Sequence, residues 1–314
     1  MGKVDASFRM NALLYIIARC LVFLLQLLPV RLAYHLGKGV GWLAWKALKR
    51  RRLVVKKNLE IVNDWLKTEG RDANQLPPLD EQVREVFLRS GANLLAGFTF
   101  TRMAPAKAEE CLELEGIEVL QEALAQDRGA IILLAHMGPW EALTQLPVFA
   151  RKHNIEAPFG AMYRPLNNKL LDEWFKRERE LKGTRLFGRK AGYHAATDFV
   201  RSGGLLGILS DQRASSGELV TFFGRKAVAT PLPGLLGLRT KAPLVSLSFS
   251  TIGPARWRIL ISKVEIDSGS EKINRAILAQ GIADAMEELL ALSPADGFWF
   301  HNRFRLPKKY LNDN

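Results

Sequence analysis

The sequence predicts an α/β fold with a mixed central sheet flanked by helices, preceded by helical segments at the amino terminus. Two observations carry this prediction. From residue 112 onward, short apolar runs rich in β-branched residues alternate with longer amphipathic segments, which is typical of strands that alternate with helices. Before residue 112 the patterns are mostly helical, and the first of them is a long apolar stretch.

Each element follows from its own pattern. The amino-terminal part predicts an apolar helix over 12–30, an amphipathic segment over 32–48, a polar loop over 64–78 and a helix over 81–101. Further along, we expect strands at 112–116, 130–136, 158–163, 184–187, 205–210, 219–223, 243–250 and 257–262. Helices are expected at 117–125, 140–153, 167–182, 192–201, 232–240 and 273–292. The chain therefore divides into an anchor helix (1–31), an amphipathic basic helical region (32–110) and an α/β core (111–314).

The apolar stretch over 12–30 is long enough for a membrane helix, since about 20 helical residues span the hydrocarbon core of a bilayer. Arg19 lies in its middle and Pro29 near its end. An unpaired arginine at that depth costs about 2.5–3.5 kcal/mol on insertion scales, which favours a tilted or interfacial helix. A buried core helix is the alternative, and Arg19 argues against a cleaved signal peptide.

The net charge of +13 implies an acidic partner, such as phospholipid head groups, a phosphorylated substrate, an acidic carrier protein or nucleic acid. Basic residues concentrate at 50–52 and 56–57, after Trp42 and Trp45, a combination that suits a surface of anionic lipid. A solvated helical face is the alternative. No motif supports nucleic-acid recognition, so we do not expect it. The two cysteines lack metal-ligand spacing, which favours a reducing compartment.

The most informative segment is HMGPWE, from His136 to Glu141, at the end of the apolar run 130–135. Gly138 and Pro139 are expected to end the strand and begin a helix. His136 then lies at the carboxyl end of a strand, where open α/β sheets bind ligands, and Glu141 lies in the first helical turn. A histidine there can accept a proton from a hydroxyl, while a nearby carboxylate fixes its tautomer. A glutamate that only complements the helix dipole is the alternative.

Polar side chains also follow two other predicted strands. Arg164 comes after the strand at 158–163, so we expect it at the same sheet edge, where its planar guanidinium suits a phosphate or carboxylate. Asp211, Gln212 and Arg213 come after the strand at 205–210. Asp211 could orient a base, accept a sugar hydroxyl, pair with Arg213, or only end the strand in a turn.

Two aromatic segments complete the candidates. Phe222 and Phe223 precede two cations, which suits a ligand that is both apolar and anionic, although a core edge is equally compatible. His301 lies among three aromatic residues, and this favours a packed histidine over a second site histidine. Zinc-ligand spacings, a GxSxG elbow, a Walker A loop and a dinucleotide GxGxxG are all absent from the sequence, so we expect no metal or cofactor.

Taken together, these motifs resemble a known family, the bacterial lipid A biosynthesis (late) acyltransferases of the lauroyl/myristoyl type, within the glycerolipid acyltransferase superfamily. The resemblance covers most of the chain. It includes the amino-terminal helix, KKNLEIV, HMGPWE, YRPLNNKLLD, GILSDQR, TFFGRKAVAT and the terminal WFHNRFR. The ordered set of motifs is far more specific than any one of them.

The resemblance implies transfer of an acyl chain from the thioester of an acyl carrier protein to a hydroxyl of a lipid A precursor, without a cofactor. It implies His136 as the general base, Glu141 as its partner, Arg164 in the catalytic cleft, and Asp211 and Gln212 shaping that cleft. The chain departs from the family where it has Met137 and Pro139 instead of the frequent Phe and Asn. It also has Arg213 where a second acid is common. These departures concern the acceptor and the acyl position more than the chemistry.

The resemblance also implies attachment to the cytoplasmic face of the bacterial inner membrane, through the amino-terminal helix. Two other functions stay open from the sequence. The first is an acyltransferase for another membrane glycolipid or for a lysophospholipid, although an EGTR-like motif is replaced here by GILSDQR. The second is a non-catalytic peripheral protein that binds anionic lipid through its basic helices, which would leave HMGPWE unexplained.

Overall fold

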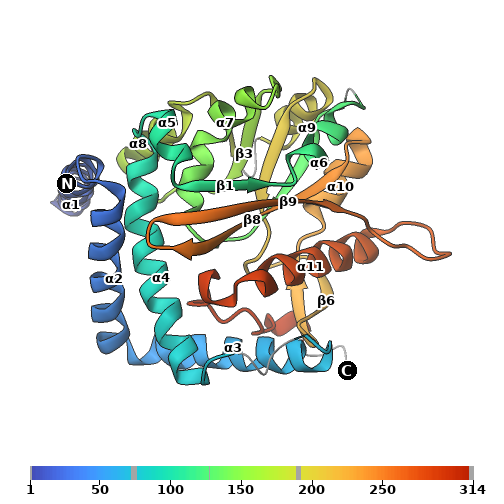
Figure 1. The fold of residues 1–314 in the computed structure, drawn as a ribbon, viewed down its shortest axis with the longest axis horizontal. Coiled ribbons are helices and arrows are strands. Elements are labelled where there is room, and N and C mark those ends of the chain that lie inside the picture. Colours follow the sequence, from blue (N-terminus) through green and yellow to red (C-terminus); the bar gives the residue numbers. More distant parts are fainter. Residues whose placement is uncertain (1, 72–75, 127, 189–191, 311–314) are drawn as a thin grey trace.

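The computed structural model describes residues 2–71, 76–126, 128–188 and 192–310, with side chains described from residue 8 onward. A seven-stranded sheet with the order β1-β9-β8-β2-β5-β3-β4 forms its centre (Figure 1). Among the described strands of this sheet only β8 and β9 pair in antiparallel fashion, so the predicted mixed sheet is confirmed and is dominated by parallel pairs. The strands are β1 (Leu112–Glu115), β2 (Ala130–Leu134), β3 (Phe159–Tyr163), β4 (Thr184–Gly188), β5 (Leu205–Leu209), β8 (Leu244–Gly253) and β9 (Arg256–Val264).

Helices flank this sheet and precede it. Four of them form the amino-terminal part: α1 (Gly2–Gln26), α2 (Val30–Ala47), α3 (Lys49–Thr68) and α4 (Leu79–Phe100). The others are α5 (Pro105–Glu109), α6 (Ile117–Leu124), α7 (Leu146–Lys152), α8 (Lys169–Glu180), α9 (Tyr193–Arg201), α10 (Leu232–Thr240) and α11 (Arg275–Leu292). Short 3₁₀ segments lie at η2 (Trp140–Gln145), η3 (Pro294–Asp296) and η4 (Lys308–Tyr310).

Beyond the first helix, two predicted boundaries need correction. The helix expected over 140–153 begins as the 3₁₀ segment η2, and α-helical geometry starts only at Leu146, where Pro147 takes the early helical position that suits proline. Helix α3 continues to Thr68, into the stretch from 64 for which the sequence predicts a loop, because Leu66 is still buried against the core.

Helices α2 and α4 cross with their backbones almost in contact, through glycines. A Cβ atom placed on Gly37 would collide with the backbone carbonyl of Gly91, and one placed on Gly41 would collide with the carbonyl of Phe87. Small residues four apart on one helix allow this kind of close approach. The GKGVG sequence therefore serves helix packing, while Gly39, on the exposed side of α2, meets nothing.

We predict that Gly37→Ala lowers the free energy of unfolding by about 1–3 kcal/mol, because the added methyl group forces α2 and α4 apart. Gly39→Ala is the matched control on the same helix. There the methyl group enters open space, and alanine should stabilise the helix by up to about 1 kcal/mol. Thermal unfolding of both variants decides the matter, and equal unfolding temperatures would refute the close crossing.

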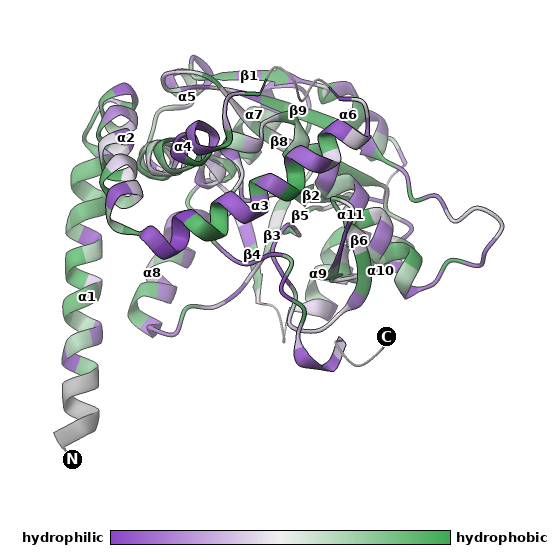
Figure 2. Ribbon diagram, turned by 90° about the horizontal axis from the view of Figure 1, so that it is seen from below, coloured by the Kyte–Doolittle hydropathy of each residue, from purple (hydrophilic) through white to green (hydrophobic). Residues whose placement is uncertain are grey.

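Helix α1 is apolar and extends along the side of the α/β body (Figure 2). Among the described residues it is the one helix long and apolar enough to cross a membrane by length and composition, over Phe8–Gln26 rather than the predicted 12–30. The helix ends at Gln26 because the chain turns before Pro29, which precedes α2. Ten large apolar side chains of this segment are 46–65% exposed: Phe8, Met10, Leu13, Leu14, Ile16, Ile17, Leu21, Phe23, Leu24 and, just beyond the end of the helix, Leu27.

Four residues of α1 that make polar contacts, Asn11, Tyr15, Arg19 and Gln26, lie on one face of the helix, one or two turns apart. The backbone carbonyl of Asn11 accepts a hydrogen bond from Asn168 at the start of α8, and the ring of Tyr15 packs edge-on against Trp174 of α8. Gln26 donates to Thr101 and to Glu178 of α8. Arg19 donates to the hydroxyl of Tyr15 and lies over its ring, so this arginine finds its partner within α1.

A small hairpin, β6 (Glu218–Phe222) and β7 (Arg225–Ala229), packs beside α11. Its turn is made by Phe223 and Gly224, both at positive φ, as tight hairpin turns require. Phenylalanine gives no turn signal, so local patterns do not predict β7. The Phe223 N–H donates to the buried carboxylate of Glu287 on α11. Burial raises the pKa of Glu287 from 4.5 to about 7.

The raised pKa of Glu287 predicts a pH-dependent stability. The folded state binds the proton of the Glu287 carboxyl more tightly than the unfolded state does. The stability that this protonated carboxyl contributes is therefore complete below pH 4.5 and is lost as the pH rises through about 7. Glu287→Gln should remove this decline and stabilise the protein above pH 7 by up to about 3 kcal/mol. Urea unfolding between pH 5 and pH 8 tests this, with the exposed Glu271→Gln as control. An unchanged pH slope in Glu287→Gln would contradict it.

Candidate active site

Three neighbouring strands end at the same edge of the sheet. Strand β5 lies between β2 and β3, and all three run parallel. His136 follows β2, Arg164 follows β3 and Asp211 follows β5. The parallel arrangement therefore brings together side chains that are far apart in the sequence. His136, Arg164 and the residues after Asp211 line one cavity of about 430 Å³ at this edge.

His136 pairs with Asp211. The Nδ1 atom of His136 lies 2.7 Å from Oδ1 of Asp211, whose side chain is only 4% exposed. Burial opposes ionisation of Asp211, but the charge of His136 and the hydrogen bond from it hold the pKa of this carboxyl below its ordinary value. An ionised Asp211 accepts from Nδ1–H, so Nε2 is left as the proton acceptor of the imidazole ring that lines the cavity.

Glu141 has a different partner from the one expected. Its two carboxylate oxygens accept from Arg179 of α8, at 2.6 Å and 3.1 Å, and in the described part of the chain no hydrogen bond joins it to His136. The chain turns sharply at Gly138, which has φ +57, and enters the 3₁₀ segment η2, so that Glu141 lies beside α4 and α8. The prediction that Glu141 fixes the tautomer of His136 is therefore corrected: Asp211 makes that contact.

Two aromatic rings hold the imidazole of His136 in place. Trp140 packs edge-on against it with ring centroids 5.6 Å apart, and Phe298 lies at 6.3 Å. Phe298 comes from the carboxyl-terminal segment, and its backbone N–H donates to the carbonyl of His136. The WFHNRFR motif hints at a role for this segment, but nothing in its sequence connects it with His136. Local sequence patterns cannot predict this contact, because 162 residues separate His136 from Phe298.

The same segment also binds a backbone N–H close to His136, which could otherwise act as a hydrogen-bond donor to a reaction intermediate. The Gly138 N–H donates to the carbonyl of Asp296, so it is already engaged and is not free to bind a developing oxyanion. Asp296 itself is buried and accepts from Asn93, Arg89 and Thr251. This network ties α4, β8 and the carboxyl-terminal segment together directly behind the site.

The cavity wall is apolar and its rim is basic. Ile132 and Leu134 point from β2 toward the same side as His136, because alternate residues of a strand share a face. Leu143, Leu146, Phe159, Ala161, Met162, Leu186, Ile208 and Leu209 also line it. Three arginines reach the cavity, namely Arg164, Arg179 and Arg213. Such a cavity suits an apolar chain that carries a polar or anionic end.

The remaining predicted residues divide between the cavity and the core. Gln212 and Arg213 line the cavity, and Arg213 donates to the carbonyl of Arg305 rather than pairing with Asp211. Phe222 and Phe223, for which the sequence allows either a ligand contact or a core edge, are 0% and 2% exposed and belong to the core. Residues of α3 and of the carboxyl-terminal segment cover their rings. Trp65 and Trp299 contact Phe223, Phe304 contacts Phe222, and the guanidinium of Arg303 lies over the ring of Phe222.

His301 is half-buried and packed, as predicted, but in the described part of the chain neither of its ring nitrogens has a hydrogen-bond partner. Burial lowers the pKa of its imidazole. Its backbone carbonyl accepts a hydrogen bond from Asn58 of α3, which fixes the carboxyl-terminal segment against that helix.

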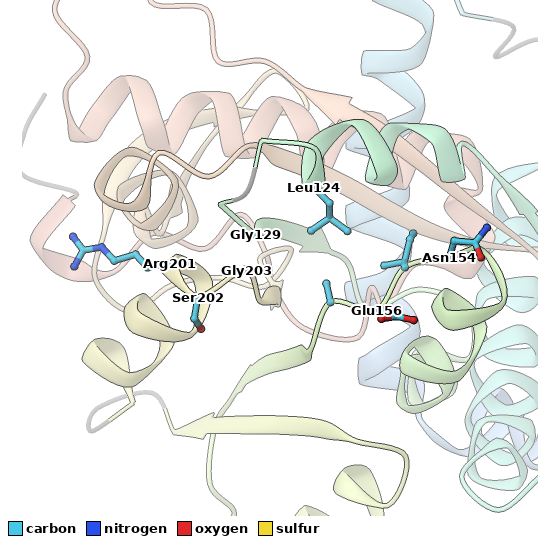
Figure 3. Close-up of a pocket in the computed structure, with 9 residues that line it drawn as sticks. Leu124, Gly129, Asn154, Glu156, Arg201, Ser202 and Gly203 are labelled. Atoms are coloured by element: carbon cyan, nitrogen blue, oxygen red, sulfur yellow. The ribbon is translucent and has the colours of Figure 1, made fainter.

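A separate hollow, of about 520 Å³, lies at the edge of the sheet opposite to His136 (Figure 3). Its lining comes from the ends of α6 and α9 and from the segments that lead into β2, β3 and β5, including Gly129 and Gly203. No histidine lines it, and Glu156 is its single carboxylate among the described residues. The cavity beside His136 is therefore the candidate active site.

The fold and the site together define a class of α/β protein in which a histidine–carboxylate pair lies at the base of an apolar cavity. The chain matches the family of bacterial lipid A biosynthesis acyltransferases over residues 3–306. It is 23% identical over 283 residues to the lipid A biosynthesis palmitoleoyltransferase of Escherichia coli (strain K12), covering 88% of this chain and 86% of that protein. The identity and both coverages are the same for a lipid A biosynthesis acyltransferase of Shigella flexneri.

A third relative matches a shorter part. The lipid A biosynthesis lauroyltransferase of Escherichia coli (strain K12) is 29% identical over 156 residues, which cover 48% of this chain and 45% of that protein. The chain belongs to the bacterial lipid A biosynthesis acyltransferase family, and acyl transfer is the activity of that family.

Proposed function

We propose that this protein transfers a fatty acyl chain from the thioester of an acyl carrier protein to a hydroxyl of a phosphorylated lipid A precursor, with His136 as general base. The observation that carries the proposal is the His136–Asp211 pair at the base of an apolar cavity. The family supplies the reaction class, and the site supplies a base beside a space for an alkyl chain.

In the proposed reaction, Nε2 of His136 takes the proton of the acceptor hydroxyl as its oxygen attacks the thioester carbonyl carbon. The tetrahedral intermediate collapses, the C–S bond breaks, and the leaving thiolate receives the proton from the imidazolium. Asp211 stabilises that imidazolium and orients the ring. The step balances without metal or cofactor, and positioned base catalysis contributes about 10²–10⁴-fold.

The guanidinium of Arg164 is our candidate donor for the oxyanion. Arg164 follows β3 and lines the same cavity as His136, while the Gly138 N–H is occupied. One donor to a developing oxyanion contributes about 2.7–4 kcal/mol. Arg179 already binds Glu141, which gives Glu141 the role of holding α8 beside the cavity rather than of assisting the base directly.

Charge and apolar surface support the proposed substrates and location. An acyl carrier protein is acidic and a lipid A precursor carries phosphates, which suits a net charge of +13 and the arginines at the rim. The exposed apolar side of α1 and the basic residues of α3 suit a bilayer with anionic head groups. We therefore place the protein on the cytoplasmic face of the bacterial inner membrane, with α1 as its anchor.

The direct test supplies the purified protein in lipid vesicles with an acyl carrier thioester and a lipid A precursor, and follows the product by mass spectrometry. A mass increase of one acyl group supports the proposal. Transfer to a lysophospholipid or another glycolipid, but not to the lipid A precursor, would replace the acceptor. Vesicle binding with no thioester consumption would identify a non-catalytic lipid-binding protein instead.

We predict that Arg164→Ala lowers kcat/KM by at least about tenfold more than Arg213→Ala, since one oxyanion donor is worth about 2.7–4 kcal/mol. Arg213 is the matched control because it lines the same cavity but is held by the carbonyl of Arg305. Steady-state kinetics with saturating acceptor measures both variants. Equal, mild losses would show that Arg164 does not contact the reacting carbonyl.

A further inference from the structure

A second apolar cavity lies beside the active-site cavity, under helices α6 and α7. Its volume is about 340 Å³. Its lining comes from β1, β2, β3, β8, β9, α6 and α7 and is almost entirely aliphatic or aromatic, and it includes Leu112, Leu114, Ile117, Leu120, Phe149, Leu247, Ile259 and Ile261. Glu109, Lys152 and His153 are its polar members, and Lys152 pairs with Glu109. Its apolar walls offer an apolar ligand contacts that water does not provide.

The strand register shows that both cavities lie on one face of the sheet. Leu134 pairs with Leu247, Leu247 with Ile261, and these positions share a face with Ile132 and His136. The active-site cavity covers this face over β2, β5, β3 and β4, and the second cavity covers it over β2, β8, β9 and β1.

A wall of three side chains separates the two spaces. Ile132, Leu146 and Phe159 line both cavities, so each has one side toward His136 and another toward the second cavity. Ile132 lies in β2 and His136 follows that strand four residues later, so the two residues are at most about 13 Å apart at 3.3 Å per residue. An alkyl chain bound with its carbonyl at His136 thus meets this wall at some distance along its length.

We propose that the second cavity receives the distal end of longer donor acyl chains, and that Ile132, Leu146 and Phe159 set the length at which chains enter it. The inference rests on the proposed acyl transfer and deepens it. The occupant is an acyl tail rather than a separate ligand because the side chains shared with the active-site cavity are all apolar, and they offer an alkyl chain contacts without any polar partner.

The test compares acyl carrier donors of graded chain length. Ile117→Trp fills the second cavity from α6, and Glu118→Trp, on the exposed face of the same helix, is its control. We expect Ile117→Trp to lower the ratio of kcat/KM for the longest over the shortest donor by at least about tenfold, since a single methylene is worth about 10–200-fold in a tight apolar pocket. Leu146→Ala should raise the same ratio, and Glu118→Trp should leave it unchanged.

A binding readout separates failure of this inference from failure of the proposed function. The same donors are titrated into each variant in a His136→Ala background, where no turnover interferes, and thermal unfolding verifies that the variants fold. Length preferences that shift in binding support the second cavity even if no acceptor is acylated. If the three variants Ile117→Trp, Leu146→Ala and Glu118→Trp had identical chain-length preferences in binding, the proposed role of the second cavity would be overturned, whether or not acyl transfer occurs.

Discussion

Replacing His136 with alanine is expected to reduce acyl transfer by at least about 10²–10⁴-fold, because the reaction loses its positioned base. The change also leaves the buried carboxylate of Asp211 without its partner, so a moderate loss of stability should accompany it. His136→Asn separates the two effects. Asparagine keeps a donor for Asp211 but cannot take a proton from a hydroxyl, so activity should be lost while the unfolding temperature changes less.

Rates of thioester consumption, measured together with thermal unfolding, decide this prediction. A folded His136→Ala protein with near wild-type turnover would refute His136 as the base. If His136→Asn retained activity, the imidazole would serve only to position the acceptor. Both outcomes are distinguishable from a folding defect, because unfolding is followed on the same samples.

The second large effect is expected at Asp211, a residue of the GILSDQR motif and not of HMGPWE. Asp211→Asn removes the charge that stabilises the imidazolium and introduces an amide N–H that can donate to Nδ1 and favour the wrong tautomer, so we expect a loss of about 10²–10⁴-fold in kcat. KM should change little, because Asp211 is buried and does not line the cavity.

Glu141→Gln is the informative comparison. Its partner is Arg179, so we expect a smaller loss of activity, together with a loss of stability from the broken ion pair. A Glu141→Gln/Arg179→Gln double variant should show coupling of about 0.5–3 kcal/mol between the two residues. If Glu141→Gln abolished turnover as completely as Asp211→Asn, without any coupling to Arg179, Glu141 would act on the reacting groups directly.

Local patterns are sufficient for most of the elements and for the edge at which the site lies. The run before His136 has the length and composition of a buried strand, and the runs before Arg164 and Asp211 have the same character. Since carboxyl ends of parallel strands meet at one edge, the sequence alone predicts that these residues lie near one another. The apolar helix at the amino terminus is equally evident, because its length and hydropathy are properties of one continuous segment.

Which carboxylate reaches His136 is decided only by the tertiary structure. Glu141 is five residues away in the chain and Asp211 is 75 away, yet the turn at Gly138 directs Glu141 toward α8 while the pairing of β2 with β5 brings Asp211 to Nδ1. The same holds for Phe222 and Phe223. Their aromatic character predicts burial, but whether they line a cavity or fill the core depends on α3 and the carboxyl-terminal segment, which cover them.

The physical reason is the range of the interactions. Helix and strand periods, proline and glycine conformations and the length of an apolar segment are set by neighbours in the chain, so they can be predicted from the sequence. Partner choice, cavity walls and the glycine contact between α2 and α4 depend on the register and packing of distant segments. A shift of one residue in a strand would turn Ile132, Leu134 and His136 to the other face, and only the folded sheet fixes that register.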